Sequence, residues 1–202
     1  NMIGSNCFYS VIPGGRSCSV FVPKGMAAGF RAKVRHKGAF VWADNQNADF
    51  GSTKTNQVSF RCSGGVRFTS GSGAANQTVA WTPGGGAWTF SSDRNLKDGF
   101  TPIDGQSILE KVASLPLTEW SFRGYEERHI GPMAQDFHKQ FGLGSTETTI
   151  NSLDVDGVTL AAIQGLYSEL KERDAALKQR DSKIESLEAR LQALEERMSR
   201  GQ

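Results

Sequence analysis

The sequence predicts a mixed fold in three parts: a glycine-rich β-strand fibre segment that is trimeric, a small α+β domain, and a C-terminal trimeric coiled coil. Glycine is concentrated early, since 14 of the 23 glycines precede Ser92. The middle of the chain mixes helical spacing with strand alternation, and its end carries a heptad pattern. We place the boundaries at 1–91, 92–158 and 159–202.

The first segment consists of short alternating runs broken by Gly, Asn and Ser, which is typical of strands and turns. These runs are 19–22, 38–42, 56–62 and 77–81. Because each run is short, a single chain is expected to bury little, and the segment is stable either as a sandwich or as copies that wrap together. We favour the second arrangement. The succession of 29–34, 40–44 and 48–50 resembles the head repeats of bacterial trimeric surface fibres.

The middle region alternates helix and strand signals. Ile108, Leu109, Val112 and Leu115 lie at helical spacing and Pro116 ends the helix. A strand is expected over 120–122, and a second amphipathic helix from about 131 to 141, with Gly142 and Gly144 after it. In 153–156 two aspartates, Asp154 and Asp156, alternate with apolar residues, which favours a strand with one solvated face over a calcium site.

Apolar residues recur at a 3-4 spacing through the last part of the chain, which predicts a coiled coil. They are Ile163, Leu166, Leu170, Leu177, Ile184, Leu187, Leu191, Leu194 and Met198. Arg173 and Arg180 occupy two of the inward positions, where polar residues fix register or oligomeric state at some cost in stability. The alternative is a long amphipathic helix packed on its own protein.

Composition excludes several classes of partner. The net charge is +2, without the clustered basic face of a nucleic-acid-binding protein, so no nucleic acid partner is expected. No apolar run is long enough for a membrane span.

Cys7, Cys18 and Cys62 are irregularly spaced, so we expect neither a metal site nor a disulfide framework, and we expect no cofactor. The chain begins with Asn1, so we expect it to be the C-terminal part of a longer protein.

A serine and a lysine lie five residues apart at the junction between the first two parts. Ser92 and Lys97 stand in the string Ser91-Ser92-Asp93-Arg94-Asn95-Leu96-Lys97. Such a pair is common by chance, and the simpler interpretation is a polar turn or helix cap in which Ser92 or Asp93 accepts backbone N–H bonds.

The motifs that follow this pair make the setting specific. After it come Leu115-Pro116-Leu117, then Trp120-Ser121-Phe122, then the segment 129–136, and then 153–156. From Ser92 to Leu170 this order resembles the C-terminal intramolecular chaperone domain of phage endosialidases and other tail spikes, which also occurs in the myelin regulatory factor.

The resemblance implies that the domain forms a homotrimer, assists folding of its own upstream β-fibre, and then releases itself by autoproteolysis. In this sequence the nucleophile falls on Ser92, the base on Lys97, and the cleavage site on the Ser91–Ser92 bond. Asp93 and His129 are supporting residues. Attack on the bond after Ser92 stays open as a variant. The implied location is a virion tail fibre or a bacterial cell surface, with folding and cleavage in the cytoplasm of the producing cell.

The two side chains can react only in suitable surroundings. A serine hydroxyl needs a neighbouring base, and a solvated lysine, with a pKa of about 10.4, is protonated and unable to act as one. Burial disfavours the ammonium form, so the pair is expected to act only when assembly packs it. Two alternative functions belong to different classes. One is a non-cleaving structural trimerisation module, and the other is a receptor- or glycan-binding fibre tip that uses Trp42, Trp81 and Trp88.

Overall fold

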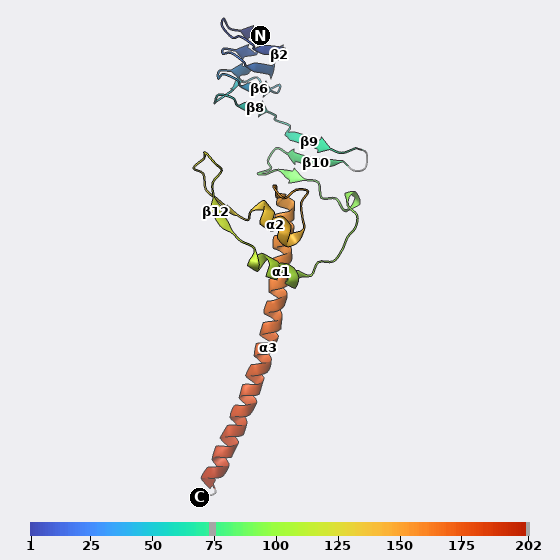
Figure 1. Ribbon diagram of the computed structural model, residues 1–202, viewed down its shortest axis with the longest axis vertical. Helices are drawn as coiled ribbons and strands as arrows, with labels where there is room; N and C mark the ends of the chain where they lie inside the picture. Colours follow the sequence, from blue (N-terminus) through green and yellow to red (C-terminus); the bar gives the residue numbers. More distant parts are fainter. Residues whose placement is uncertain (73–75, 201–202) are drawn as a thin grey trace. The chain divides into compact units, whose positions relative to one another are not determined.

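The computed structural model describes residues 1–72 and 76–200, in two compact units, Asn1–Gly99 and Phe100–Gln202. Figure 1 shows the elements of each unit. The first unit contains β1 (Met2–Ile3), β2 (Val11–Arg16), β3 (Ser19–Val20), β4 (Met26–Phe30), β5 (Ala32–Val34), β6 (Phe40–Ala43), β7 (Phe50–Gly51), β8 (Val58–Arg61), β9 (Val66–Ser70), β10 (Gln77–Trp81), β11 (Thr89–Phe90) and the 3-10 helix η2 (Arg94–Leu96). The second contains α1 (Gly105–Ser114), β12 (Thr118–Trp120), β13 (His129–Gly131), α2 (Ala134–Phe141) and α3 (Ser152–Arg200).

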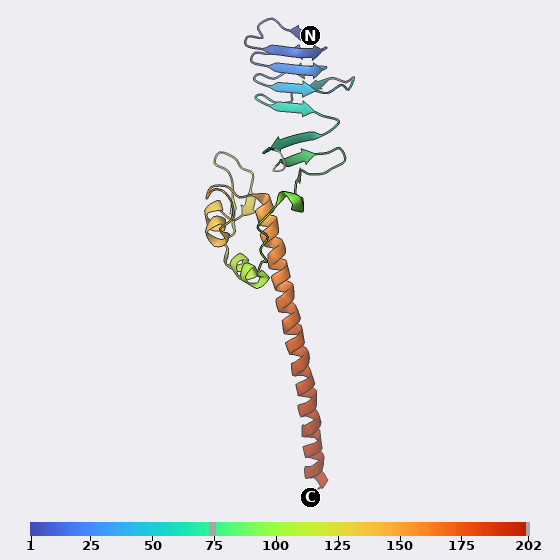
Figure 2. The same ribbon diagram turned by 90° about the vertical axis from the view of Figure 1, so that its right-hand side faces the viewer.

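Strands β1 to β8 form a solenoid. They alternate between two parallel four-stranded sheets, ordered β1-β3-β5-β7 and β2-β4-β6-β8. Equivalent positions stack from coil to coil: Met26 pairs with Phe40, and Phe40 pairs with Val58. Figure 2 shows these strands lying one above another within the unit. The predicted β-rich segment is therefore present, as a parallel stack.

The core of the solenoid is built from small side chains enclosed between the two sheets. Its members are Cys18, Val20, Ala27, Ala32, Val34, Ala39, Val41 and Ala43, none more than 1% exposed. The sequence predicts that neighbouring copies cover such short strands. A single chain encloses this core instead, because small residues on facing strands fill the narrow space between two sheets.

Glycines allow the coils to approach closely at one corner. Gly15 and Gly29 both have positive φ, and their strand partners are Gly29 and Ala43 respectively. A Cβ added to Gly29 would lie 1.9 Å from the Ala43 carbonyl oxygen, and one added to Gly15 would lie 2.0 Å from that of Gly29. Glycine is therefore required there for both backbone conformation and stacking distance.

An ion pair closes the last coil of the solenoid. The Arg61 guanidinium Nε donates to an Asp44 carboxylate oxygen at 2.7 Å, and its other nitrogens donate to backbone carbonyls that include those of Gln46 and Ala48. The Ser63 backbone N–H donates to the second Asp44 oxygen at 2.7 Å. Hydrogen bonds from Ser63, followed by the weaker contribution of Arg61, hold the pKa of Asp44 well below its usual range.

Strands β9, β10 and β11 form an antiparallel sheet, in the order β11-β10-β9. It carries an aromatic group in which the rings of Trp81 and Trp88 lie 5.7 Å apart and those of Phe68 and Trp88 lie 6.1 Å apart. All three side chains are exposed, as is Trp42 on the solenoid. Strand β10 has the bounds predicted from the sequence.

In the second unit α1 packs closely against the start of α3. Gly105 and Gly165 meet at the contact, where a Cβ on Gly165 would lie 2.2 Å from the Gly105 carbonyl oxygen. Val158, Ala161 and Ala162 are also buried on this face of α3. Helix α1 ends before Pro116 as predicted, and α2 ends at Gly142, whose φ is 67°. The predicted strand over 120–122 lies two residues earlier, at Thr118–Trp120.

One sequence prediction is wrong in this unit. The segment 153–156 is helical, not a strand, and belongs to α3, which begins at Ser152. The Asn151 side-chain oxygen accepts from the Leu153 backbone N–H at 3.0 Å and so caps the helix. The local alternation was short, and the helical periodicity that continues into Val158 and Ala161 overrides it. Gly201 and Gln202, at the end of the predicted coiled coil, lie outside the described residues.

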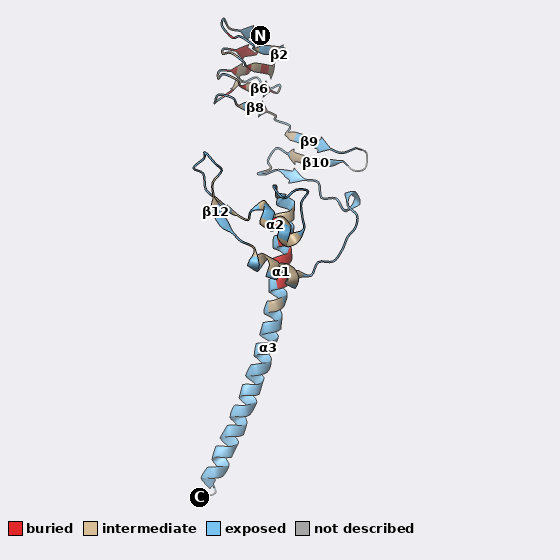
Figure 3. Cartoon of the chain, in the orientation of Figure 1, coloured by how far each residue is buried: buried red, intermediate tan, exposed pale blue. Residues whose placement is uncertain are grey.

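Helix α3 extends over 49 residues, and from Lys171 to Arg200 every residue is exposed in the single chain, as Figure 3 shows. The alternative that this helix packs along its length on its own protein therefore has no support in the described residues. Among those residues, no helix combines the length and the apolar character that crossing a membrane requires.

We predict that Gly29→Ala destabilises the solenoid far more than Gly14→Ala, which meets no atom within 4 Å. Positive φ strain is on the order of 1–3 kcal/mol, and the clash with Ala43 adds to it. Hydrogen exchange of peptides from 18–43, followed by mass spectrometry, should show protection reduced roughly 5- to 150-fold in Gly29→Ala. Equal exchange in the two variants would contradict the stacking argument.

A second prediction concerns pH. Because the folded-state pKa of Asp44 is depressed, its contribution to stability is present above the ordinary aspartate pKa, about 3.9, and is lost as the pH falls below it. Asp44→Asn should therefore lower the stability of the solenoid most at neutral pH, and the difference from wild type should shrink below about pH 4. The matched control is Asp49→Asn, whose partner Arg31 is far more exposed than Arg61. A pH-independent difference would contradict the assignment.

Candidate functional site

The side chains of Ser92 and Lys97 meet in the structure. Lys97 Nζ donates to Ser92 Oγ at 2.7 Å. The single turn η2 lies between them, and Lys97 caps it through its backbone N–H, which donates to the Arg94 carbonyl oxygen at 3.1 Å. A lysine nitrogen at this distance from a serine hydroxyl is within reach for proton transfer.

Asp93 forms the start of this turn. Its carboxylate accepts from the backbone N–H of Asn95 at 2.9 Å and from the side-chain amide of Asn95 at 3.0 Å. The Leu96 backbone N–H donates to the Asp93 carbonyl oxygen at 3.2 Å. The helix-cap interpretation of the sequence is thus correct for Asp93, and the cap exists together with the Ser92–Lys97 contact. These contacts cap the turn that lies between Ser92 and Lys97.

Ser91 is fastened to the antiparallel sheet. Its backbone N–H donates to the Thr78 carbonyl oxygen at 2.9 Å, and its Oγ accepts from the Thr78 backbone N–H at 2.7 Å. The Ser91–Ser92 bond therefore lies immediately after the last residue held by the sheet. Sequence reasoning predicted the strand that contains Thr78 but missed this role, because the pairing of β10 with β11 is not encoded in any local motif.

Ser91, Ser92, Asp93 and Lys97 are all exposed in the single chain. Solvent stabilises an ammonium group in its charged form, and a charged lysine cannot accept the serine proton. The geometry for a serine–lysine pair is present, and the described residues of the first unit leave both side chains exposed.

His129, the other supporting residue predicted from the sequence, lies in β13 of the second unit. It is half-buried in an aromatic group, with its ring 4.8 Å from that of Trp120 and 5.8 Å from that of Phe122. Trp120 also pairs with it across the hairpin. Trp120 Nε1 is buried and has no hydrogen-bond partner among the described residues. These contacts support a packing role for His129.

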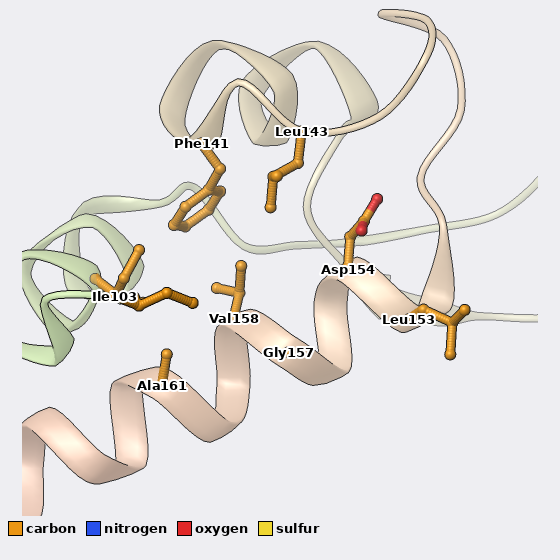
Figure 4. Close-up of a pocket in the computed structure, with 9 residues that line it drawn as sticks. Ile103, Phe141, Leu143, Leu153, Asp154, Gly157, Val158 and Ala161 are labelled. Atoms are coloured by element: carbon orange, nitrogen blue, oxygen red, sulfur yellow. The ribbon is translucent and has the colours of Figure 1, made fainter. Parts of the chain in front are cut away.

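The second unit also contains an apolar cavity of about 290 Å³. Figure 4 shows Phe141 and Leu143 directed toward Val158 of α3, with the Asp154 carboxylate as the charged group on its wall. Asp154 is the single titratable residue in this lining, so the cavity offers neither a nucleophile with a base nor a pair of carboxylates. It is a packing feature beside the helix contact.

Metal ligands do not gather within the described residues, where no group of three or more His, Cys, Asp or Glu side chains could hold an ion. Cys7 and Cys18 are buried and free, and Cys62 is a half-buried free thiol. Burial, together with the nearby Asp44 charge, raises the pKa of the Cys62 thiol. This environment disfavours the reactive thiolate form.

Comparison with protein-family models gives a match over part of the chain. A family model described as chaperone of endosialidase matches residues 92–142. No curated protein and no solved structure matches the chain. The matched segment begins at Ser92 and contains both Lys97 and His129. The match confirms, over 92–142, the resemblance to the endosialidase chaperone family drawn from the sequence, and it indicates an intramolecular chaperone role for this segment.

Proposed function

We propose that the chain is a self-releasing intramolecular chaperone. It forms a homotrimer, assists folding of its own upstream β-segment, and cuts the Ser91–Ser92 bond by means of Ser92 and Lys97. The observation that carries the proposal is the 2.7 Å contact between Lys97 Nζ and Ser92 Oγ at the start of the segment that matches the family. The proposed setting is a virion tail fibre or a bacterial surface fibre.

The chemistry follows from the positions of the groups. Neutral Lys97 takes the Ser92 hydroxyl proton while Oγ attacks the Ser91 carbonyl carbon. The C–N bond between Ser91 and Ser92 breaks, and the proton passes to the departing α-amine of Ser92. This N-to-O shift leaves an ester between the Ser91 acyl group and Ser92 Oγ. Water then hydrolyses the ester, giving a Ser91 carboxylate and a fragment that begins with Ser92.

Assembly supplies the condition that one copy lacks. Both members of the pair are exposed in the single chain, so the lysine needs burial by neighbouring copies to become a neutral base. The anchoring of Ser91 to Thr78 holds the carbonyl that is attacked at a fixed place beside the turn. Cleavage would then report that the copies have folded and associated.

We predict that Ser92→Ala and Lys97→Met abolish cleavage, while wild type yields two fragments on a denaturing gel. Alanine removes the nucleophile, and methionine keeps the length of lysine but cannot accept a proton. Matched controls are Ser70→Ala and Lys54→Met, which remove the same groups at exposed positions elsewhere in the first unit. Mass spectrometry of the smaller fragment locates the cut.

Several outcomes bear on this proposal. A fragment with Ser92 as its first residue supports the acyl shift, and one that begins with Asp93 supports attack on the following bond. An uncut wild-type chain that sediments as a trimer would instead establish the non-cleaving structural module. An uncut monomer would contradict the proposal altogether.

A further prediction concerns Asp93. Asp93→Asn should preserve cleavage, because an asparagine oxygen can accept the same backbone N–H at the start of the turn. Asp93→Ala should slow cleavage by roughly 2- to 30-fold, the equivalent of losing a helix cap. The measurement is the rate at which the full-length band disappears. Complete loss of cleavage in Asp93→Asn would show that the carboxylate takes part in the chemistry.

A further inference from the structure

Charge is distributed unevenly along the chain. Residues 1–91 contain nine Lys or Arg and two Asp or Glu, whereas 92–202 contain 14 Lys or Arg and 19 Asp or Glu. The overall charge of +2 therefore combines a first part at +7 with a second part at −5. A strongly basic segment attracts anionic polymers.

Four of the nine cations of the first part lie on one edge of the solenoid, which we call the basic edge. This edge consists of the turns that lead from the sheet of β1, β3, β5 and β7 to the sheet of β2, β4, β6 and β8. All four cations are exposed, and none of these turns contains an aspartate or a glutamate. The turns are 4–10, 21–25, 35–39 and 52–57, and the cations are Lys24, Arg35, Lys37 and Lys54.

Backbone hydrogen bonds stack the turns of the basic edge. The Gly38 N–H donates to the Pro23 carbonyl oxygen at 3.3 Å, and the Asn56 N–H donates to the Lys37 carbonyl oxygen at 3.0 Å. Neighbouring strands of a sheet lie about 4.8 Å apart, so the three coils that carry the cations extend over about 10 Å along the solenoid axis. The fold thus brings together cations that are far apart in the sequence, which is why no basic cluster is visible in the sequence itself.

A buried serine organises the most basic of these turns. Ser52 is 4% exposed, and its Oγ accepts from the backbone N–H groups of Arg35 at 3.0 Å and His36 at 3.2 Å. The His36 ring Nδ1 lies 3.1 Å from the same oxygen. Because these hydrogen bonds hold the backbone of the turn, the side chains of Arg35 and Lys37 extend from an ordered support.

The acidic residues of the solenoid pair with cations outside the basic edge. Asp49 pairs with Arg31 and Lys33. Asp44 pairs with Arg61. Across the described part of the chain, none of the four cations of the basic edge belongs to an ion pair. Their positive charge is therefore available to a ligand.

The spacing of the cations favours an extended anion over a small one. A single exposed ion pair contributes little to affinity, so one small anion would be held weakly. A polymer with repeated anionic groups meets the cations of successive coils at the same time, which multiplies the weak contacts. Phosphate groups suit both kinds of cation present, because a phosphate monoester carries a charge of about −1.5 to −2 and three acceptor oxygens.

The residues between the cations favour a sugar polymer over a nucleic acid. The turns 35–39 and 52–57 carry three of the four cations and contain no aromatic residue on which a base could stack. Thr53, Thr55 and Asn56 are exposed beside Lys54. Their hydroxyl and amide groups are suited to hydrogen bonds with sugar hydroxyls.

We propose that the basic edge of the solenoid binds a polysaccharide that bears phosphate groups, which lie against Lys24, Arg35, Lys37 and Lys54. The inference goes beyond the proposed chaperone function, since all of these residues precede the Ser91–Ser92 bond. Binding requires neither member of the candidate catalytic pair, and the site would stay on the upstream fragment after a cut.

The experiment measures binding of the full chain to immobilised phosphorylated dextran at low salt. Lys37→Gln with Lys54→Gln should weaken binding roughly 2- to 30-fold, because two exposed charge contacts are lost. Arg16→Gln with Arg67→Gln is the matched control, since it removes the same charge from exposed positions outside the basic edge and should bind nearly as well as wild type. High salt should weaken binding of the wild type. Circular dichroism checks that both double variants fold.

Three further polymers test the chemistry of the ligand. Unmodified dextran should not bind, and carboxymethyl dextran of equal charge density should bind more weakly than phosphorylated dextran. Carboxymethyl dextran that binds equally well overturns the choice of phosphate, and tighter binding of single-stranded DNA overturns the choice of a sugar polymer. Equal loss in the two double variants overturns the basic edge as the site. A wild-type chain that does not bind phosphorylated dextran overturns the whole inference and leaves the proposed chaperone function standing.

Discussion

Among the described residues of one copy, more large apolar side chains are exposed than buried. The solenoid encloses only small side chains, while its aromatic residues, such as Trp42 and Phe60, remain exposed. The apolar heptad residues of α3, from Ile163 to Met198, are all exposed. Exposed apolar surface on this scale marks an interaction surface. The need to cover this apolar surface explains the other features of the molecule. An isolated copy leaves both its longest helix and its candidate catalytic pair exposed to solvent.

The Ser92–Lys97 pair illustrates how the proposed assembly and the proposed chemistry could be linked. The turn from Ser92 to Lys97 sets the distance between the two side chains locally, through the Asp93 cap. The surroundings of the two side chains depend instead on their neighbours, and in one copy both side chains are exposed. The distance between the Ser92 and Lys97 side chains is therefore set within the single chain. We propose that the ability of this pair to cleave depends on assembly. In the proposed function, such a division would prevent cutting before the copies associate.

Much of the fold could be predicted from local patterns. Short local sequence signals predict the end of α1 before Pro116, the Gly142 cap of α2, strand β10 and the heptad helix. The pairing of strands could not be predicted, since parallel stacking joins residues a full coil apart, such as Met26 and Phe40. The strand predicted over 153–156 was wrong, because that prediction rested on four alternating residues and ignored the helical period that continues after them. For the site, Ser92, Lys97 and Asp93 were predicted, and the Thr78 anchor was not.

The anchor at Ser91 has a mechanical consequence for the two products of the proposed cut. All strands of the first unit, β1 to β11, precede the Ser91–Ser92 bond, and every helix and strand of the second unit follows it. The two hydrogen bonds between Ser91 and Thr78 stay on the upstream side. Among the described elements, cutting there would separate no paired strands and would divide no helix. It would free η2, the turn between Ser92 and Lys97, from the upstream fragment. The upstream fragment would end at Ser91, which is still hydrogen-bonded to Thr78 of the sheet. Its new C-terminus would therefore resist fraying.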